Sequence, residues 1–126
     1  MQWKLNKENL SGEYIAGFVQ ADGSFSVRLA SKTRNSKRYL HLSLVFTIVQ
    51  NQKYKDLILE IQKRFGGIGH WYLNKADKTI RYQVSSQKDF INVIIPFFMK
   101  YQLRSGKLLS FLCFKYIVEV MSTRAH

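Results

Sequence analysis

The apolar residues of this 126-residue chain follow two spacings in turn, one typical of helices and one typical of strands. Residues 11–22 have helical spacing, with Ser11 placed to act as the N-cap. From Ser24 apolar and polar residues alternate, and after a basic loop residues 39–49 alternate again, which predicts two paired strands. The side chains expected to face the core are Phe25, Val27, Leu29, Leu40, Leu42, Leu44, Phe46 and Ile48. Those expected on the opposite face of the second strand are Tyr39, His41, Ser43, Val45 and Thr47.

The second half of the chain repeats this order. Residues 53–65 have helical spacing and stop at Gly66-Gly67, a pair that favours the end of a helix. Two more strands are expected at residues 69–75 and 78–86, joined by a turn at residues 75–78. In the later strand Ile80, Tyr82 and Val84 are expected to point inward.

Two further helices complete the pattern. Ser86 and Asp89 resemble a capping box before a third helix that must yield near Pro96, and a final helix is expected at about residues 105–121. The predicted order is αββαββα, an α+β fold with one antiparallel sheet and the helices on one of its faces. No linker composition interrupts the chain, so residues 1–126 are expected to form a single domain.

The net charge of the chain narrows the class of its binding partner. Twenty Lys and Arg oppose eight Asp and Glu, which gives a formal net charge of +12 and a pI near 10.0. No apolar run has the length of a membrane span, and the first residues lack a signal-peptide core, so neither membrane insertion nor secretion is expected. A basic domain of this kind favours nucleic acid as its partner, while a solvated basic surface or a ribosomal-type structural role is the alternative.

The polar face of the predicted sheet has a matching chemistry. Arginine, lysine, histidine and amide side chains lie on it, with no outward acid inside the strands. Solvent could cover such a face, but side chains of this kind also read base edges in a major groove while the rim contacts phosphates. The residues that carry this pattern are Arg28, Lys32, His41, Asn74, Arg81 and Gln83.

Two residues in the first helix are unfavourable for a helix alone. Asp22 lies at the C-terminal end, where the helix dipole disfavours a carboxylate by roughly 0.3–1 kcal/mol, although Asp-Gly is also a common turn pair. Gly17 lies mid-helix, at a cost of about 1 kcal/mol relative to alanine. Gly17 and Ala21 are four residues apart and lie beside Ala16, so the helix has a stripe of small residues that allows another helix to approach closely.

These residues occur within Ile15-Ala16-Gly17-Phe18-Val19-Gln20-Ala21-Asp22-Gly23, which resembles the LAGLIDADG motif of homing endonucleases. Ala16, Gly17, Ala21, Asp22 and Gly23 match outright, whereas Gln20 replaces an acid often found at that place. The resemblance extends over nearly the whole chain, through the element order and the segments Phe46-x-Ile48-x-Gln50, Arg64–Gly69 and Lys100-Tyr101-x-Leu103-x-x-x-Lys107.

The resemblance implies a catalytic role for three residues. Asp22, with Ala21 beside it, would hold Mg²⁺ (Mn²⁺ as a substitute), and two copies of Asp22 would meet at a twofold axis. Gln50 matches a position that orders the attacking water, with a simple strand-terminating amide as the alternative. Lys107 matches the active-site lysine, and the nearby Arg104 and Lys100 are competing choices.

The implied assembly is a homodimer whose two sheets form a saddle over double-stranded DNA. The helix residues expected at the dimer interface are Ala16, Gly17, Gln20 and Ala21. The residues expected to contact DNA are Ser24, Ser26, Arg28, Lys32, Arg34, Lys37, Arg38, His41, Ser43, Thr47, Tyr72, Asn74, Lys75, Lys78, Arg81 and Gln83. A strand over residues 24–32 spans roughly nine base pairs, so the twofold predicts a near-palindromic site of roughly 18 base pairs or slightly more.

Three functions fit this fold. The first is a site-specific, intron-encoded DNA endonuclease that makes double-strand breaks. The second is an RNA maturase that assists intron splicing, with intron RNA as its partner, and the third is a catalytically silent DNA-binding protein. The intact Asp22, together with Gln50 and a lysine, favours the endonuclease. An intron-encoded protein of this family would be made in place within a mitochondrion or chloroplast.

Overall fold

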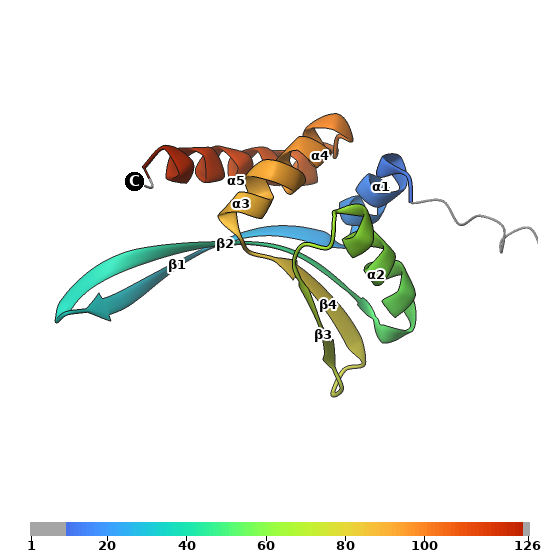
Figure 1. The fold of residues 1–126 in the computed structure, drawn as a ribbon, viewed down its shortest axis with the longest axis horizontal. Helices are drawn as coiled ribbons and strands as arrows, with labels where there is room; N and C mark the ends of the chain where they lie inside the picture. Colours follow the sequence, from blue (N-terminus) through green and yellow to red (C-terminus); the bar gives the residue numbers. More distant parts are fainter. Residues whose placement is uncertain (1–9, 125–126) are drawn as a thin grey trace, which may run out of the picture.

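A computed structural model describes residues 10–124, and its elements follow the order expected from the sequence. The helices lie on one side of a single four-stranded antiparallel sheet, which arches so that its other face is concave (Figure 1). The elements are α1 (Gly12–Asp22), β1 (Gly23–Arg34), β2 (Lys37–Asn51), η2 (Gln52–Tyr54), α2 (Lys55–Arg64), β3 (His70–Asn74), β4 (Thr79–Val84), α3 (Gln87–Asp89), η3 (Phe90–Ile94), α4 (Ile95–Lys100) and α5 (Ser105–Arg124).

The start and end of α1 are both set by local contacts. Ser11 caps the helix as expected, because its hydroxyl accepts a hydrogen bond from the backbone N–H of Tyr14 at 3.0 Å. At the other end the helix passes directly into β1 at Gly23, whose N–H donates to the carbonyl of Val19. A β-carbon at Gly23 would lie 2.5 Å from Val19 Cγ1, so a larger residue does not fit there. Asp22 is therefore the last helical residue, directly before the sheet.

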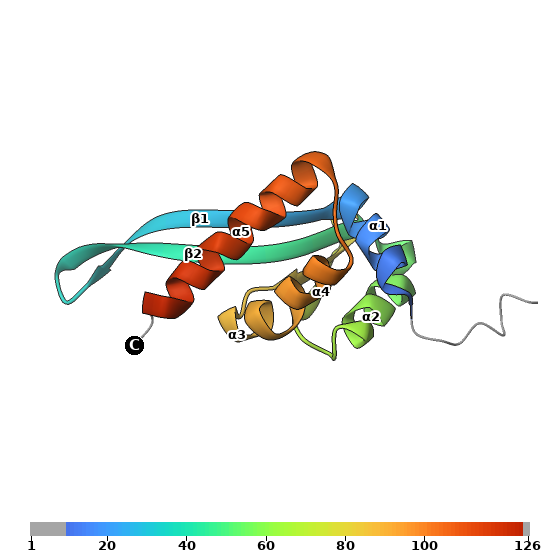
Figure 2. The ribbon, with the colours of Figure 1, turned by 90° about the horizontal axis from the view of Figure 1, so that it is seen from above.

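The strands are arranged in the order β1-β2-β4-β3, and all neighbours are antiparallel. β2 pairs with β1 along nearly its whole length, but it pairs with β4 only from Phe46 to Asn51. The first part of β2 therefore belongs to a two-stranded hairpin with β1, which extends beyond the four-stranded part of the sheet (Figures 1 and 2).

Aromatic side chains join the helices to the covered face of the sheet. The ring of Phe25 lies 5.1 Å from that of Phe46 and 5.4 Å from that of Phe111 in α5, measured between centroids. Phe98 of α4 lies 5.7 Å from Phe46. One hydrophobic core therefore contains residues from α1 to α5. Aromatic side chains dominate such cores because each buries a large apolar area.

The inward-facing residues of the hairpin were predicted only in part. Leu44, Phe46 and Ile48 are buried, but Leu29 and Leu40 are 64% and 69% exposed. Val27 is also exposed. The alternation is correct, but the helices cover only the base of the hairpin, and its far end extends beyond them (Figure 2).

Thr47 departs from the prediction in the opposite sense. Although it lies on the uncovered face, only 7% of it is exposed. It pairs with Ser24 on one side and Gln83 on the other, so strands on both sides of β2 cover it.

The third helix departs from regular α-helical geometry near Pro96, as predicted, but it does not end there. The chain instead adopts a π-helical turn over Phe90–Ile94, in which the N–H of Ile95 donates to the carbonyl of Phe90, and then continues as α4. Pro96 stands at the first turn of α4, where its missing N–H costs least. The last helix also continues beyond residue 121, as far as Arg124. Within residues 10–124, none of these helices is long and apolar enough to cross a membrane.

Candidate active site and nucleic-acid interface

The end of α1 and the end of β2 bring two of the predicted catalytic side chains into contact. Gln50 Nε2 donates a hydrogen bond to Asp22 Oδ2 at 2.7 Å, and Gln50 Oε1 accepts one from the backbone N–H of Asn51 at 3.2 Å. The two bonds fix the orientation of the amide and occupy one carboxylate oxygen. Among the described residues no hydrogen bond reaches Asp22 Oδ1, and the side chain is exposed.

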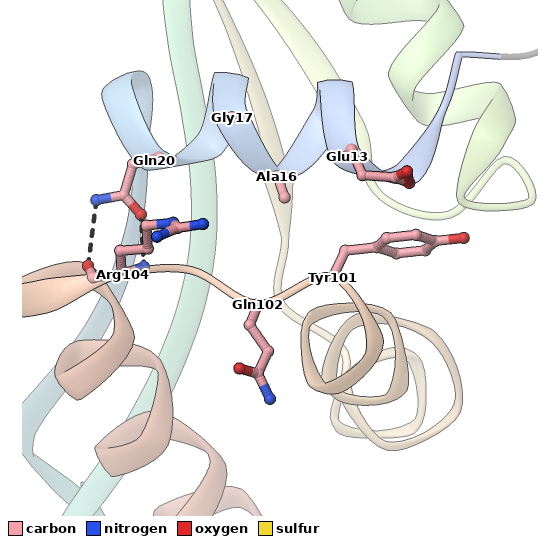
Figure 3. Close-up of a pocket in the computed structure, with 7 residues that line it drawn as sticks. All are labelled: Glu13, Ala16, Gly17, Gln20, Tyr101, Gln102 and Arg104. Atoms are coloured by element: carbon pink, nitrogen blue, oxygen red, sulfur yellow. Dashed lines mark hydrogen bonds between the residues drawn. The ribbon is translucent and has the colours of Figure 1, made fainter.

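Lys107 reaches the same place from the first turn of α5. Its ammonium group donates a hydrogen bond to the carbonyl oxygen of Gly23, the residue that follows Asp22. The two competing cations lie elsewhere: Lys100 Nζ lies 5.2 Å from the ring centroid of Tyr101, and the Arg104 side chain lies beside α1 near Gln20 (Figure 3). Of these three cations, Lys107 is the one that makes a hydrogen bond to the residue following Asp22.

The main chain before Lys107 is held to α1 by one side chain. Gln20 Oε1 accepts a hydrogen bond from the backbone N–H of Arg104 at 2.8 Å, and Gln20 Nε2 donates one to the carbonyl of the same residue at 3.2 Å (Figure 3). The residues are separated by 84 positions in the sequence. A shallow pocket of about 220 Å³ adjoins this contact, lined by Glu13, Ala16, Gly17, Gln20, Tyr101, Gln102 and Arg104.

The residues expected at a dimer interface do not share one face of α1. Gly17 and Ala21 are exposed, and a β-carbon at Gly17 would meet nothing within 4 Å. Ala16, in contrast, is 7% exposed and packs in the chain's own core, and Gln20 is half-buried against Arg104. The sequence grouped Ala16 with Gly17 because both are small, but neighbouring positions point about 100° apart on a helix.

Asp22 supplies only part of the ligand set that a metal ion needs. Within residues 10–124 no three His, Cys, Asp or Glu side chains are grouped so that they could hold a metal. Mg²⁺ takes oxygen ligands, keeps several waters, and is often held by one or two carboxylates together with substrate phosphates. The exposed carboxylate of Asp22 suits such an ion only when phosphate oxygens and a second carboxylate complete the ligand set.

The uncovered face of the sheet collects most of the residues expected to contact nucleic acid. The strand register pairs Arg28 with Ser43 and Tyr72 with Arg81, so side chains from all four strands share this face. Lys75 and Lys78 lie in the turn between β3 and β4. The other members of the set on this face are Ser24, Ser26, Lys32, Arg34, Lys37, His41, Thr47, Asn74 and Gln83.

Two members of the predicted set differ from the rest, and one residue was missed. Arg38 pairs with Thr33, and the alternation places it on the side of the sheet that carries the helices. Thr47 is on the concave face but buried, as described above. His70, exposed and opposite Gln83, lies on this face although the sequence pattern did not assign it. The signal was available, because His70 lies two residues before Tyr72 and alternate residues of a strand share a face.

Comparison with known proteins agrees with this arrangement. The family model described as LAGLIDADG endonuclease matches residues 15–118, which include most of α1, the whole sheet and most of α5. The chain belongs to the LAGLIDADG endonuclease family. The resemblance noted in the sequence and the expected fold are both confirmed.

Two fungal proteins are similar to this chain in sequence. The chain is 37% identical over 119 residues to the "Probable intron-encoded DNA endonuclease 1" of Mycosarcoma maydis, a match that covers 94% of this chain and 41% of the relative. It is 35% identical over 119 residues to the "Probable intron-encoded endonuclease 2" of Neurospora crassa, covering 93% of this chain and 26% of the relative. The chain therefore spans less than half the length of these relatives.

Solved LAGLIDADG structures have the same fold. The I-SmaMI homing endonuclease bound to cleaved DNA matches with a TM-score of 0.82 and 29% identity, over 93% of this chain and 38% of that one. I-LtrWI bound to target DNA matches with a TM-score of 0.82 and 33% identity, over 90% of this chain and 38% of that one. I-SmaMI also matches in a complex with uncleaved DNA and calcium ions.

Proposed function

We propose that this chain is a homing endonuclease that cuts both strands of a long, near-palindromic DNA site by hydrolysing phosphodiester bonds. The observation that carries the proposal is the meeting of Asp22, Gln50 and Lys107 at the junction of α1 and β1. This junction lies at the start of a sheet whose concave face is lined with cations and amides. The intron-encoded relatives and the DNA-bound structures support the same reading.

The three side chains have distinct roles in this proposal. A divalent cation, Mg²⁺ with Mn²⁺ as a substitute, would be held by Asp22 and the adjoining main chain of Ala21, and it would supply charge neutralisation and an activated water. Gln50 holds one carboxylate oxygen of Asp22 and so directs the other toward the cation and the DNA. Lys107 places a positive charge where negative charge develops on the phosphate.

The partner in the proposal is a second copy of the chain. The exposed Gly17 and Ala21 allow the backbone of another α1 to approach closely, and one Asp22 supplies only part of a metal site. We expect light scattering of the protein with its DNA to give two chains per site, and the twofold requires a near-palindromic target. A complex with one chain that still cuts both strands would contradict the homodimer. A single chain that never cuts would indicate that a further segment, as in the longer relatives, supplies the second half.

The length of the target follows from β1. Its 12 residues at about 3.3 Å each reach roughly 40 Å, or about 12 base pairs per copy. We therefore expect cleaved sites of roughly 24 base pairs, longer than the estimate from residues 24–32 because the strand is longer. Selecting cleaved molecules from a randomised DNA library in the presence of Mg²⁺ would identify them.

Asp22 provides the decisive test of the chemistry. We expect Asp22→Asn to abolish cleavage, because the other carboxylate of α1, Glu13, lies in its first turn. DNA binding in Ca²⁺ should stay within a few-fold of the unaltered protein. Glu60→Gln removes an exposed carboxylate from the outer side of α2 and serves as the control. Cleavage by Asp22→Asn at a rate near that of the unaltered protein would refute the assignment.

The relatives also indicate an origin. Both fungal relatives are named as intron-encoded, and we propose that this chain is likewise made from an intron within a mitochondrion or chloroplast.

A further inference from the structure

The side chain of Gln20 is polar and half-buried, and both its amide oxygen and its amide nitrogen make a hydrogen bond. The family motif often has an acid at this position, and the sequence places Gln20 among the interface residues. In the structure its amide instead grips one residue of its own chain, bonding to both the N–H and the C=O of Arg104. An amide is matched to that task, because it accepts and donates at once, whereas a carboxylate can only accept.

Arg104 is the residue directly before α5. Its carbonyl accepts the N–H of Leu108 at 3.2 Å, the first hydrogen bond of the helix, and it also accepts Gln20 Nε2. Ser105, the next residue, has a φ of 53°, a left-handed conformation that non-glycine residues adopt at a cost unless neighbouring contacts hold it. The two Gln20 bonds are side-chain hydrogen bonds to the main chain of Arg104, next to this residue.

Lys107 follows two residues later and returns to α1. Its ammonium donates to the carbonyl of Gly23, so α1 and the first turn of α5 are joined at both Gln20 and Gly23. Because Lys107 has a long and flexible side chain, the position of its charge depends on where its own backbone is anchored.

We infer that Gln20 is a positioning residue for Lys107: by holding the N–H and C=O of Arg104, it sets the first turn of α5 so that the Lys107 ammonium reaches the carbonyl of Gly23, the residue after Asp22. The inference rests on the proposed function for its catalytic consequence, but its geometric part concerns the free protein. It gives Gln20 a task within one chain instead of one between two chains.

The geometric part is tested by the reactivity of Lys107. We expect Gln20→Ala to increase the rate at which an acetylating reagent labels Lys107 several-fold, measured by mass spectrometry on the protein without DNA. Gln62→Ala is the matched control, because Gln62 Nε2 also bonds main-chain carbonyls, those of Ile68 and Gly69 at 3.2 Å each, away from Lys107. Equal labelling of Lys107 in the unaltered protein and Gln20→Ala would overturn the inference whether or not the protein cuts DNA.

The catalytic part is tested by a double-mutant cycle. We expect Gln20→Ala to lower the single-turnover cleavage rate about 10- to 100-fold with little change in DNA affinity in Ca²⁺, since a small displacement of a reacting group costs that much. In a Lys107→Met background the same change should have almost no further effect. Equal rate losses in both backgrounds would show that Gln20 does not act through Lys107.

The charge and length of the replacement give a second comparison. Gln20→Glu keeps the length and can accept from the N–H of Arg104, but it cannot donate to the carbonyl, so its labelling and cleavage rates should lie between those of the unaltered protein and Gln20→Ala. If Gln20→Glu has the same labelling and cleavage rates as Gln20→Ala, the bond to the Arg104 carbonyl carries the whole effect. If Gln20→Glu has the rates of the unaltered protein, that bond has no role. If the unaltered protein cuts no DNA while labelling of Lys107 still responds to Gln20→Ala, the proposed function fails and the positioning contact stands.

Discussion

At Gly23 one absent β-carbon determines where Asp22 can lie. The helix passes into β1 without a loop only because the backbone of Gly23 approaches Val19 to a distance that no side chain tolerates. Asp22 is thereby held at the edge of the sheet within reach of Gln50, although the end of a helix disfavours a carboxylate by roughly 0.3–1 kcal/mol. A bound cation would reverse that penalty, because its charge is the largest in the site.

Tyr82 shows a different use of a buried polar group. Its hydroxyl donates to the carbonyl of Ile68 at 2.8 Å, and burial, with a smaller contribution from Asp89, raises the pKa of Tyr82 above its ordinary value of 10.0. The unfolded chain therefore loses this proton at a lower pH than the folded one, so stability is full below pH 10 and falls as the pH rises above it.

The corresponding prediction compares Tyr82→Phe with the unaltered protein. Between pH 10 and 11 the unaltered protein should lose up to about 1.4 kcal/mol of unfolding free energy through Tyr82, and Tyr82→Phe should not. At pH 7 the variant should be about 1 kcal/mol less stable, because it lacks one hydrogen bond. Urea unfolding of both proteins at pH 7, 10 and 11 measures these free energies. Equal losses of stability in the two proteins between pH 10 and 11 would contradict the prediction.

The sequence identified some of these residues and could not identify others. Asp22 and Gln50 stand in a recognisable motif and at the end of an alternating strand, so local patterns predicted them. The bond between Gln20 and Arg104 joins positions 84 apart, and nothing local to either residue indicates it. The choice among Lys100, Arg104 and Lys107 likewise required the path of the turn before α5, which is set by tertiary contacts.

On the scale of elements, α1 has one face buried in the core of its own chain and another face that is exposed. Ile15, Ala16 and Val19 bury one side of the helix, whereas Tyr14, Gly17 and Ala21 remain exposed on the other. Stability of the isolated chain and stability of a helix pair should therefore respond to different residues.

Gly17→Ala tests that separation. In the single chain the added methyl group meets nothing within 4 Å, and alanine favours a helix by about 1 kcal/mol, so thermal stability at low protein concentration should rise. If a second α1 packs against Gly17, dimerisation measured by analytical ultracentrifugation should weaken. Gly106→Ala, in α5 and also with nothing within 4 Å, should not alter dimerisation. A dimer unaffected by Gly17→Ala would argue against packing at this residue.

The sequence pattern predicted the type of each element better than it predicted which of its residues are buried. Every predicted helix and strand is present, because alternation and helical spacing are local properties. The exposed Leu29 and Leu40 show the limit: alternation identifies a face, but it does not show how far the helices above it extend. Near Pro96 the local rule predicted that the helix would yield, and tertiary structure decided that it does so through a π-helical turn and then continues.

For the molecule as a whole, the distribution of charge predicts how binding depends on salt. The cations expected at DNA lie along the concave face, its hairpin and the β3–β4 turn. Log affinity should fall linearly with log salt, with a slope near −0.9 for each phosphate neutralised. Lys32→Ala should reduce the slope by about 1, whereas Lys63→Ala, on the helical side, should leave it unchanged. Fluorescence anisotropy in Ca²⁺ measures both, and equal slopes for the two variants would exclude the concave face as the DNA surface.

The projecting hairpin of β1 and β2 has a consequence for how the protein can change over time. Beyond the helices neither of its faces contributes to the core, so replacing Arg28, Lys32 or His41 removes no buried contact and alters stability by only about 0.5 kcal/mol or less. Asp22 and Gln50 lie at the opposite end of the hairpin strands, where α1 ends before β1 and where β2 ends. Under the proposed function, a lineage that must follow a drifting target could therefore exchange residues on the hairpin while Asp22 and Gln50 stay intact. The same division would make the hairpin the place to randomise in order to redirect cleavage to a chosen sequence.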